Sequence, residues 1–412
     1  MNPPDTSPDP TPESALGGIG FVESVVLMVL MISLVALSID AMLPALADIG
    51  RDLAVADPND SQLVVSMLLL GMGLGQVIYG PLSDSIGRKP TIYLGVGIFI
   101  TGCALSVTAA DFTMMLLGRV LQGIGAAGPR TVIVALIRDQ YEGRAMARIL
   151  SLVMAVFILV PVLAPALGQA ILFVAHWRWI FGLLLGLALI GLTWFALRQP
   201  ETLAPEKRRP FRLGRIALAV KEACGHRVAF GYTLAGGVVF GAFLGYLNSA
   251  QQIFQQTYGL GELFPIYFGG LAIAIGGASY LNARLVMRFG MRLLSHRALI
   301  VTVAASLACL PLAWMAGGVP PLWLLMAYLA VAFFCFGLLF GNFNALAMEP
   351  LGHIAVVGAA VVGSLQTLIS VVFGVAIGRA YDGGLVPLVT GFAVLGLMSM
   401  ALMRWAEPKP KQ

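Results

Sequence analysis

The chain has 412 residues, of which 59% are hydrophobic and only 11% carry a charge. A soluble domain carries charge on about 25% of its residues. A soluble protein this apolar could not cover its surface with polar groups, so the excess apolar residues must face lipid. The net charge of +5 does not indicate a nucleic-acid partner, because the basic residues lie in short polar stretches between apolar runs.

Long apolar runs predict the transmembrane helices, since a bilayer core needs roughly 20 apolar residues per helix. Six runs precede a polar stretch and six follow it, which predicts an all-α integral membrane protein of twelve transmembrane helices in two pseudo-symmetric six-helix bundles. The predicted helices are 22–46, 61–82, 91–110, 112–137, 147–174, 177–197, 228–252, 264–286, 297–316, 321–347, 354–379 and 384–404.

The expected domains follow from the same runs. Residues 22–198 form the N-terminal bundle and 228–405 the C-terminal bundle, joined by a cytoplasmic linker at 199–227. Residues 1–21 and 406–412 are expected to be cytoplasmic tails. The first tail is rich in Pro, Asp, Ser and Thr and its first 20 residues hold no Lys or Arg, so we expect a disordered segment and no cleavable signal peptide.

The distribution of Lys and Arg predicts the orientation. If the N-terminus is cytoplasmic, 20 of the 25 basic residues lie in cytoplasmic segments, and only Arg51, Arg178 and Arg379 lie on the opposite side. The positive-inside rule therefore places both termini in the cytoplasm. Three charged residues, Asp40, Arg119 and Arg130, fall inside predicted spans. Intramembrane charges are costly, so these three are functional candidates.

The two bundles carry a faint repeat. The loop after the second span ends in Gly87-Arg88, and the loop after the eighth ends in Gly290 followed by Met291 and Arg292. Two bundles with matching loops are typical of transporters that rock about a central cavity. A channel or a receptor would not predict that match.

The first of these loops reads GPLSDSIGRK over residues 80–89 and resembles the loop 2–3 signature of the major facilitator superfamily. In that reading the loop is a latch: Gly80 allows close helix approach, Gly87 permits the turn, and Asp84 faces the positive N-terminal end of the eleventh helix near His353. The alternative is a solvated turn whose charges only anchor the topology. The latch residues are Gly80, Asp84, Gly87, Arg88 and Lys89.

Residues 116–127 resemble the helix 4 signature of the superfamily's proton-driven exporters, with small residues for close packing and Arg119 pointing into the cavity. Asp40 and Arg119 both lie about 10 Å below the outer surface at 1.5 Å per residue. They are therefore expected to pair directly or to compete through water, and so to couple proton binding to transport. The alternatives are that Asp40 satisfies backbone freed by the kink at Pro44 and that Arg119 is a structural hydrogen-bond donor.

The fifth predicted helix resembles the antiporter motif, with Ala164 and Gln169 as departures from its glycines. Its motif residues, expected to bend the helix against a partner in the other half, are Pro161, Pro165 and Gly168. This version, together with residues 38–46, 246–260 and 342–355, resembles the bicyclomycin and chloramphenicol resistance (Bcr/CflA-like) branch. That resemblance implies a drug:proton antiporter of the bacterial inner membrane that acts as a monomer and uses no cofactor.

Several polar residues are candidates for the substrate cavity. Arg130 follows Arg119 by 11 residues and lies within about 20° of the same helix face; it either recognises anionic substrates or snorkels toward the cytoplasm beside Asp139. Amides recur along the seventh helix at Asn248, Gln251, Gln252 and Gln255, and line the cavity or bind neighbouring helices. The remaining cavity candidates are Met42, Gln122, Met154, Phe157, Tyr246 and Gln366.

These features predict proton-coupled export of small amphipathic molecules by alternating access, with a small-molecule substrate, protons and the lipid bilayer as partners. The alternative is a dedicated exporter of one metabolite, such as an amino acid derivative, a sugar or a siderophore. We expect no enzyme, because the sequence shows no metal-ligand cluster, nucleotide-binding loop or nucleophile triad, and its longest loop, about 30 residues, is too short for a catalytic domain.

Overall fold

The computed structural model describes residues 20–141 and 143–407. The side chains at 144, 145, 147, 151 and 154–158 lie outside this description, as does most of the two predicted tails. The described residues form helices and turns, with no strand among them. Twelve of the described helices are 20 residues long or longer.

The first part of the chain, called here the N-terminal group, contains the helices up to residue 198. They are α1 (Phe21–Asp40), η1 (Leu43–Ala45), α2 (Leu46–Asp52), η2 (Pro58–Gln62), α3 (Leu63–Ile86), α4 (Arg88–Val107), α5 (Phe112–Gln140), α6 (Gly143–Val174) and α7 (Arg178–Arg198). The first predicted span is broken after Asp40, because Pro44 has no N–H to give to the Asp40 carbonyl.

The linker holds η3 (Pro205–Lys207) and α8 (Leu213–Gly225). The helices that follow are called the C-terminal group. They are α9 (Arg227–Gln251), the π-helical turn η4 (Gln252–Thr257), η5 (Gly261–Leu263), α10 (Phe264–Phe289), α11 (Met291–Met315), α12 (Leu322–Met348), η6 (Glu349–Ile354), α13 (Ala355–Arg379) and α14 (Val386–Ala406).

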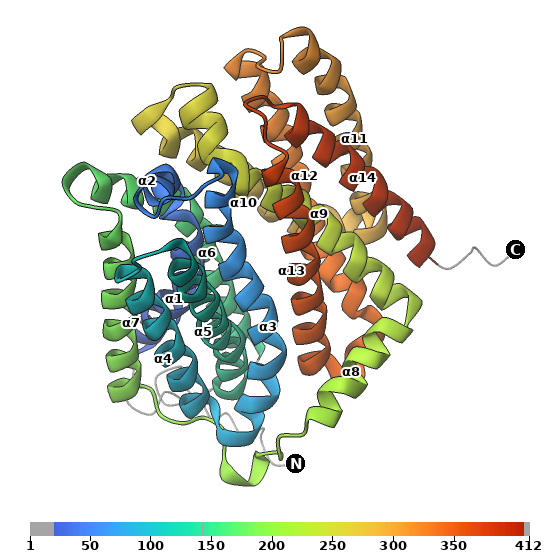
Figure 1. Ribbon diagram of the computed structural model, residues 1–412. Coiled ribbons are helices and arrows are strands. Elements are labelled where there is room, and N and C mark those ends of the chain that lie inside the picture. Colours follow the sequence, from blue (N-terminus) through green and yellow to red (C-terminus); the bar gives the residue numbers. More distant parts are fainter. Residues whose placement is uncertain (1–19, 142, 408–412) are drawn as a thin grey trace, which may run out of the picture.

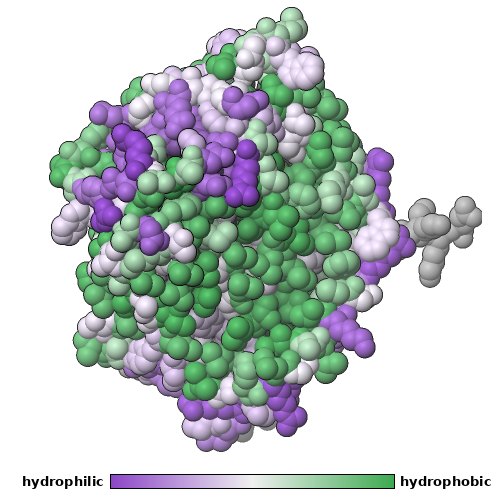
Figure 2. Space-filling model, viewed as in Figure 1, coloured by the Kyte–Doolittle hydropathy of each residue, from purple (hydrophilic) through white to green (hydrophobic). Residues whose placement is uncertain are grey.

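The described residues contain ten helical stretches that are long and apolar enough to cross a membrane. One of them, 322–379, includes both α12 and α13, and α6 adds the shorter apolar segment Leu159–Val174. Figure 2 shows the resulting surface, a broad apolar band with hydrophilic residues above and below it. The predicted fold class, an all-α multi-pass membrane protein, is confirmed.

In Figure 1 the N-terminal group gathers on one side and the C-terminal group on the other, with α8 at the lower edge beneath the C-terminal group. The groups meet where α3 packs on α13 and where α6 packs on α10. We call the end with the α3–α4 turn and α8 the basic end, and the end with α2, η2 and η4 the far end. The exact domain boundaries given above stay a prediction.

The internal repeat has a structural counterpart. Gly87 lies between α3 and α4 with φ +108°, and Gly290 lies between α10 and α11 with φ +77°. Both values fall where a side chain is disfavoured, so each loop uses its glycine for the same turn. The predicted correspondence of the two loops is confirmed at this position.

The linker is more ordered than the sequence pattern indicated. Its helix α8 buries Ile216, Ala219 and Ala223 and packs on α9 and α13. These residues recur at helical spacing, which was the available signal for an amphipathic helix. The many polar residues around them made the segment look like an irregular linker and hid this helical pattern.

Candidate functional site

Asp40 is the last residue of α1 and lies where the first membrane helix breaks. Its side chain is only 5% exposed. Within the described part of the chain, no hydrogen bond or ion pair reaches its carboxylate. It lies within electrostatic range of Tyr246 on α9, whose hydroxyl is buried and has no hydrogen-bond partner among the described residues. The two side chains come from different groups, so this carboxylate lies at the interface between them.

The motif on α6 positions the break beside Asp40. A Cβ atom on Gly168 would lie 1.8 Å from the Ala41 carbonyl oxygen, so only glycine allows α6 to approach this backbone. Pro161 and Pro165 both lie inside one uninterrupted helix. Between them, Val162 contacts Gly269 on α10 of the other group. The motif therefore lies between Asp40 and the opposite group of helices.

Arg119 does not face a cavity in this conformation, contrary to expectation. Its side chain is fully buried and donates hydrogen bonds to the Ser38 carbonyl at 2.7 Å and to the Val64 carbonyl at 2.7 Å. A third donor reaches the amide oxygen of Gln122, and the guanidinium lies over the ring of Phe181. Arg119 therefore ties α1, α3, α5 and α7 together, and one of its bonds ends two residues before Asp40. No direct bond to Asp40 forms among the described contacts.

Gln122 also belongs to the interior of the N-terminal group. It is fully buried, accepts from Arg119 and donates to Ser106 on α4 at 3.1 Å. The small residues of the same signature pack as predicted: a Cβ on Gly123 would lie 1.9 Å from the Leu68 carbonyl oxygen. Gln122 is therefore a packing residue here and does not line the cavity, because α4 covers it.

Arg130 is partly buried on α5, and its one hydrogen bond among the described residues goes to the Met72 sulfur at 3.4 Å. Thioether sulfur is a weak acceptor, and the other donors of the guanidinium have no hydrogen-bond partner among the described residues. The expected pairing with Asp139 is absent, because Asp139 accepts from Arg88 at 2.8 Å. The pairing with Asp139 that accompanied the snorkelling alternative is not observed in the described part of the chain, and the role of Arg130 stays a prediction.

The cavity candidates at the end of α9 and nearby differ in whether they line an open cavity. Asn248, Gln251 and Gln252 line a cavity of about 390 Å³ at the far end. Tyr246 and Met42, by contrast, are fully buried, and Tyr246 packs against Phe333 with ring centroids 4.7 Å apart. Tyr246 and Met42 therefore do not line an open cavity in this conformation, because neighbouring side chains enclose them.

The other cavity candidates lie elsewhere. Gln366 on α13 is partly buried and lies against Gly236 on α9, so it is an interhelical contact within the C-terminal group. The side chains of Met154 and Phe157 lie outside the described residues.

Polar contacts join the two groups at the far end. Gln252 donates to the Asn59 side-chain oxygen at 2.7 Å, and Asn59 donates to the Tyr381 carbonyl at 2.9 Å. Arg379 pairs with Asp60 at 2.8 Å. Gln252 was a predicted cavity residue, but these contacts were not predicted, because they join segments about 190 to 320 positions apart in the chain.

The predicted latch is organised differently from expectation. Asp84 pairs with Arg88 at 2.6 Å, and Arg88 also pairs with Asp139. All three charged side chains therefore form their ion pairs within the N-terminal group. His353 pairs instead with Glu222 of α8 at 2.5 Å. Among the described residues, the Asp84 carboxylate makes no hydrogen bond or ion pair with the start of α13, because its partner Arg88 is on α4. The latch role stays a prediction for another conformation.

Two glycines of the latch behave differently. Gly87 makes the turn that the sequence predicted. A Cβ on Gly80 would meet nothing within 4 Å, so the expected close helix approach at Gly80 is absent here. Next to the turn, the Glu201 carboxylate accepts from the backbone N–H groups of Arg88 and Lys89 at 3.0 Å each. Glu201 thus caps α4 from the linker, a role that its sequence position gave no signal for.

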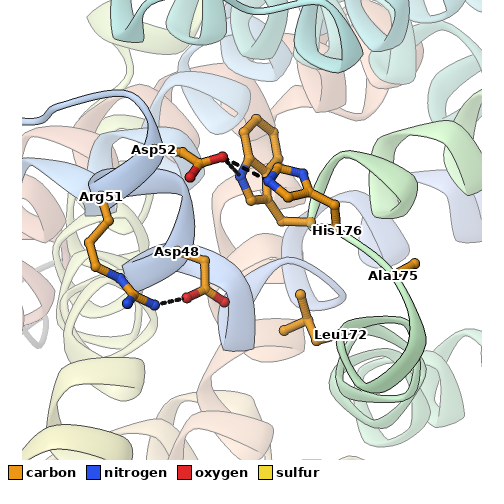
Figure 3. A pocket seen from close by; sticks show the side chains of 7 residues that line it. Asp48, Arg51, Asp52, Leu172, Ala175 and His176 are labelled. Carbon is orange, nitrogen blue, oxygen red and sulfur yellow. Dashed lines mark hydrogen bonds and ion pairs between the residues drawn. The ribbon is translucent and has the colours of Figure 1, made fainter.

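A second far-end cluster fixes α2. The Asp52 carboxylate accepts from His176 at 2.8 Å, Trp177 at 2.9 Å and Arg178 at 3.3 Å, as Figure 3 shows for His176. His176 and Trp177 lie in the turn between α6 and α7, and Arg178 is the first residue of α7. The cluster therefore holds the segment that follows Asp40 and Pro44 against the rest of the N-terminal group.

A family model described as Major Facilitator Superfamily matches residues 28–375. The chain belongs to this superfamily. Its relatives include the bicyclomycin resistance protein homolog of Haemophilus influenzae, 29% identical over 82% of this chain and 84% of that protein. Multidrug resistance protein D of Escherichia coli is 30% identical over 84% of this chain and 86% of that protein. These relatives support the drug-efflux branch that the motifs resemble.

Solved structures agree on the fold. The xylose transporter XylE of E. coli, in a partially occluded inward open conformation, matches with a TM-score of 0.69 and 14% identity over 92% of this chain and 96% of that one. Family membership makes the protein a membrane-embedded transporter of small molecules and not an enzyme.

Proposed function

We propose that this transporter exports small amphipathic molecules, drugs among them, in exchange for protons across the bacterial inner membrane. The observation that carries the proposal is Asp40, a buried carboxylate without a described partner at the interface between the groups. An unpaired carboxylate in a low-dielectric site is costly as an anion, so it is suited to take up a proton. The basic end would face the cytoplasm with both termini.

Alternating access gives the coupling a physical basis. The hydrogen bonds that join the groups lie at the far end and near mid-membrane, where Ser364 donates to the Gly73 carbonyl at 2.6 Å. No such bond joins them at the basic end among the described residues. Arg119 bonds the Ser38 carbonyl and Gly168 packs on Ala41. Movement of α5 or α6 would therefore displace the backbone on either side of Asp40.

The test is efflux from proteoliposomes driven by an imposed pH gradient, with ethidium as the transported probe. Asp40→Asn keeps the size of the side chain but removes the proton site, so gradient-driven efflux should be abolished while the melting temperature is retained. Asp382→Asn, an exposed carboxylate in the α13–α14 turn, is the matched control and should transport normally. Undiminished proton-driven efflux by Asp40→Asn would refute the assignment.

Arg130 supports a further part of the proposal, that substrates with an anionic group are accepted. A guanidinium with unused donors in a partly buried site pairs strongly with a carboxylate. Arg130→Ala should weaken transport of the anionic dye carboxyfluorescein about tenfold or more, while transport of ethidium changes little. Arg130→Lys keeps the positive charge and should retain part of the carboxyfluorescein transport that Arg130→Ala loses. Equal losses for both dyes would indicate a structural role.

The alternative, a dedicated exporter of one endogenous metabolite, makes a different prediction in cells. Expression in an efflux-deficient bacterium should raise resistance to several unrelated drugs if the protein has a broad spectrum. Resistance to a single compound, or to none, would favour the dedicated exporter. This comparison is independent of whether protons drive the transport.

A further inference from the structure

The far-end cavity lies between the two groups of helices. Its floor consists of buried amides, with Gln62 of η2 on one side and Asn248 of α9 on the other, each 2% exposed. Exposed residues, Arg51, Pro58 and Gln256, line its rim. A volume of about 390 Å³ is within the range of small-molecule sites. The cavity is therefore large enough for part of a substrate and opens toward the far end.

The floor contains polar atoms that the protein leaves unpaired. Both amide atoms of Gln62 and the Asn248 nitrogen are buried without a hydrogen-bond partner among the described residues. Neighbouring amides are satisfied: Gln252 donates to Asn59 at 2.7 Å and Gln251 donates to Gln255 at 2.9 Å. A buried unpaired amide is costly to the fold. These two side chains thus carry a cost that a ligand could offset.

The unpaired atoms define the chemistry of a matching ligand. The Gln62 and Asn248 nitrogens are available to donate, whereas the Gln62 oxygen lies against Gly378 of α13, and the floor carries no charge. The one cation at the rim, Arg51, already pairs with Asp48. An uncharged group with an oxygen that accepts hydrogen bonds, in an amide or a hydroxyl, fits this set best. A charged group would find no counter-ion on the floor.

We propose that this cavity is an exit subsite that binds an uncharged amide or hydroxyl group of the exported molecule. The inference rests on the proposed export function, because that function sets the direction in which the molecule passes through the cavity. Gln62 belongs to the N-terminal group and Asn248 to the C-terminal group, so separation of the groups at the far end divides the site. The π-helical turn η4, which begins at Gln252 beside the floor, is a geometry often found at functional sites. Opening would thereby release the bound group outward.

The test measures binding to the purified protein, with chloramphenicol as an uncharged probe that carries an amide and hydroxyl groups. Gln62→Met keeps the length of the side chain and removes both unpaired atoms, so the Kd for chloramphenicol should rise about tenfold. Asn248→Ala provides a second variant on the opposite wall, with the same expected direction. Ethidium, a cation without an amide or hydroxyl group, should bind both variants as it binds the wild type.

The matched control is Gln140→Met. Gln140 also has an unpaired buried amide oxygen, but it lies at the end of α5 outside this cavity. Its replacement should leave the Kd for chloramphenicol unchanged. Melting temperatures check the folding of every variant, and Gln62→Met should not lower its own, since it removes unpaired polar atoms. Unchanged binding by Gln62→Met and Asn248→Ala, or no binding by the wild type, would overturn the proposal.

A labelling experiment locates the site independently. A cysteine introduced at the rim as Gln256→Cys should react with a membrane-impermeant maleimide, and chloramphenicol should slow the reaction in the wild-type background but not with Gln62→Met. Equal protection in both backgrounds would place the ligand elsewhere. Neither measurement requires transport, so the subsite can fail while pH-driven ethidium efflux succeeds, and the reverse.

Discussion

At the far end, polar side chains cross from one group of helices to the other, as Gln252 does to Asn59 and Arg379 does to Asp60. At the basic end the charges stay on one side: Arg88 pairs with Asp84 and with Asp139, all within the N-terminal group. The contrast indicates that this conformation is held closed at the far end. The basic end is held together by the linker and has no direct bond between the groups among the described residues.

The two ends also differ in packing. Gly378 of α13 lies so near η2 that an added Cβ would be 1.6 Å from the Gln62 amide oxygen, while a Cβ added to Gly80 at the basic end would meet nothing within 4 Å. Both lie on the pair of helices, α3 and α13, along which the groups meet. Close contact at the far end and open space at the basic end is what alternating access requires of a state that opens at the basic end. The following changes test that difference.

The largest effect is expected from Gly378→Val. Its branched side chain would overlap Gln62 and Asn248, so the far end could close only by moving α13. We expect the population to shift toward far-end opening. Spin labels at Asp57 and Glu262, exposed on opposite groups, should report a longer distance in a background without native cysteines.

The control for this shift is Gly277→Val on α10, where an added Cβ would meet nothing within 4 Å. Its distance distribution should match that of the parent protein. If Gly378→Val gave the same distribution as the control, the far-end contact would not determine the conformation. Melting temperatures distinguish a shifted equilibrium from a loss of folding.

A smaller, local effect is expected from Glu201→Ala. This change removes the acceptor for the Arg88 and Lys89 backbone N–H groups. Loss of a helix cap costs about 0.5–2 kcal/mol of stability. The melting temperature should therefore fall, while the spin-label distance at the far end should stay unchanged. A change in that distance would show that the contacts of Glu201 with Arg88 and Lys89 are coupled to the contacts between the two groups at the far end.

Much of the fold followed from periodic features of the sequence. Apolar runs near 20 residues predicted the membrane helices, and Gly87 and Gly290 predicted matching turns. The helix 4 signature predicted close packing, which the contact of Gly123 with Leu68 confirms. Each of these depends on local composition or on one backbone angle, so one sequence suffices to predict it.

The direction in which a side chain points was harder to predict. Helical spacing placed Arg119 at the depth of Asp40, yet spacing does not say whether α1 and α3 will offer it backbone carbonyls. The break before Pro44 leaves carbonyl groups at the end of α1 without backbone N–H donors. Arg119 donates a hydrogen bond to one of these carbonyls, that of Ser38. The contacts of Asn59, Gln62 and Gly378 depend on how two distant segments dock in one conformation. Sequence patterns within a single helix contain no information on that docking.

The smallest effect is expected at the ion pair between Asp60 and Arg379. Their side chains are 31% and 55% exposed, and an exposed pair contributes only about 0.2–1 kcal/mol. Asp60→Asn and Arg379→Gln, separately and together, should give a coupling energy in that range, measured as the shift in the open fraction of the spin-label distribution. High salt should reduce it further. A coupling energy well above this range would make the ion pair, and not the packing of Gly378 on Gln62, the main contact that keeps the far end closed.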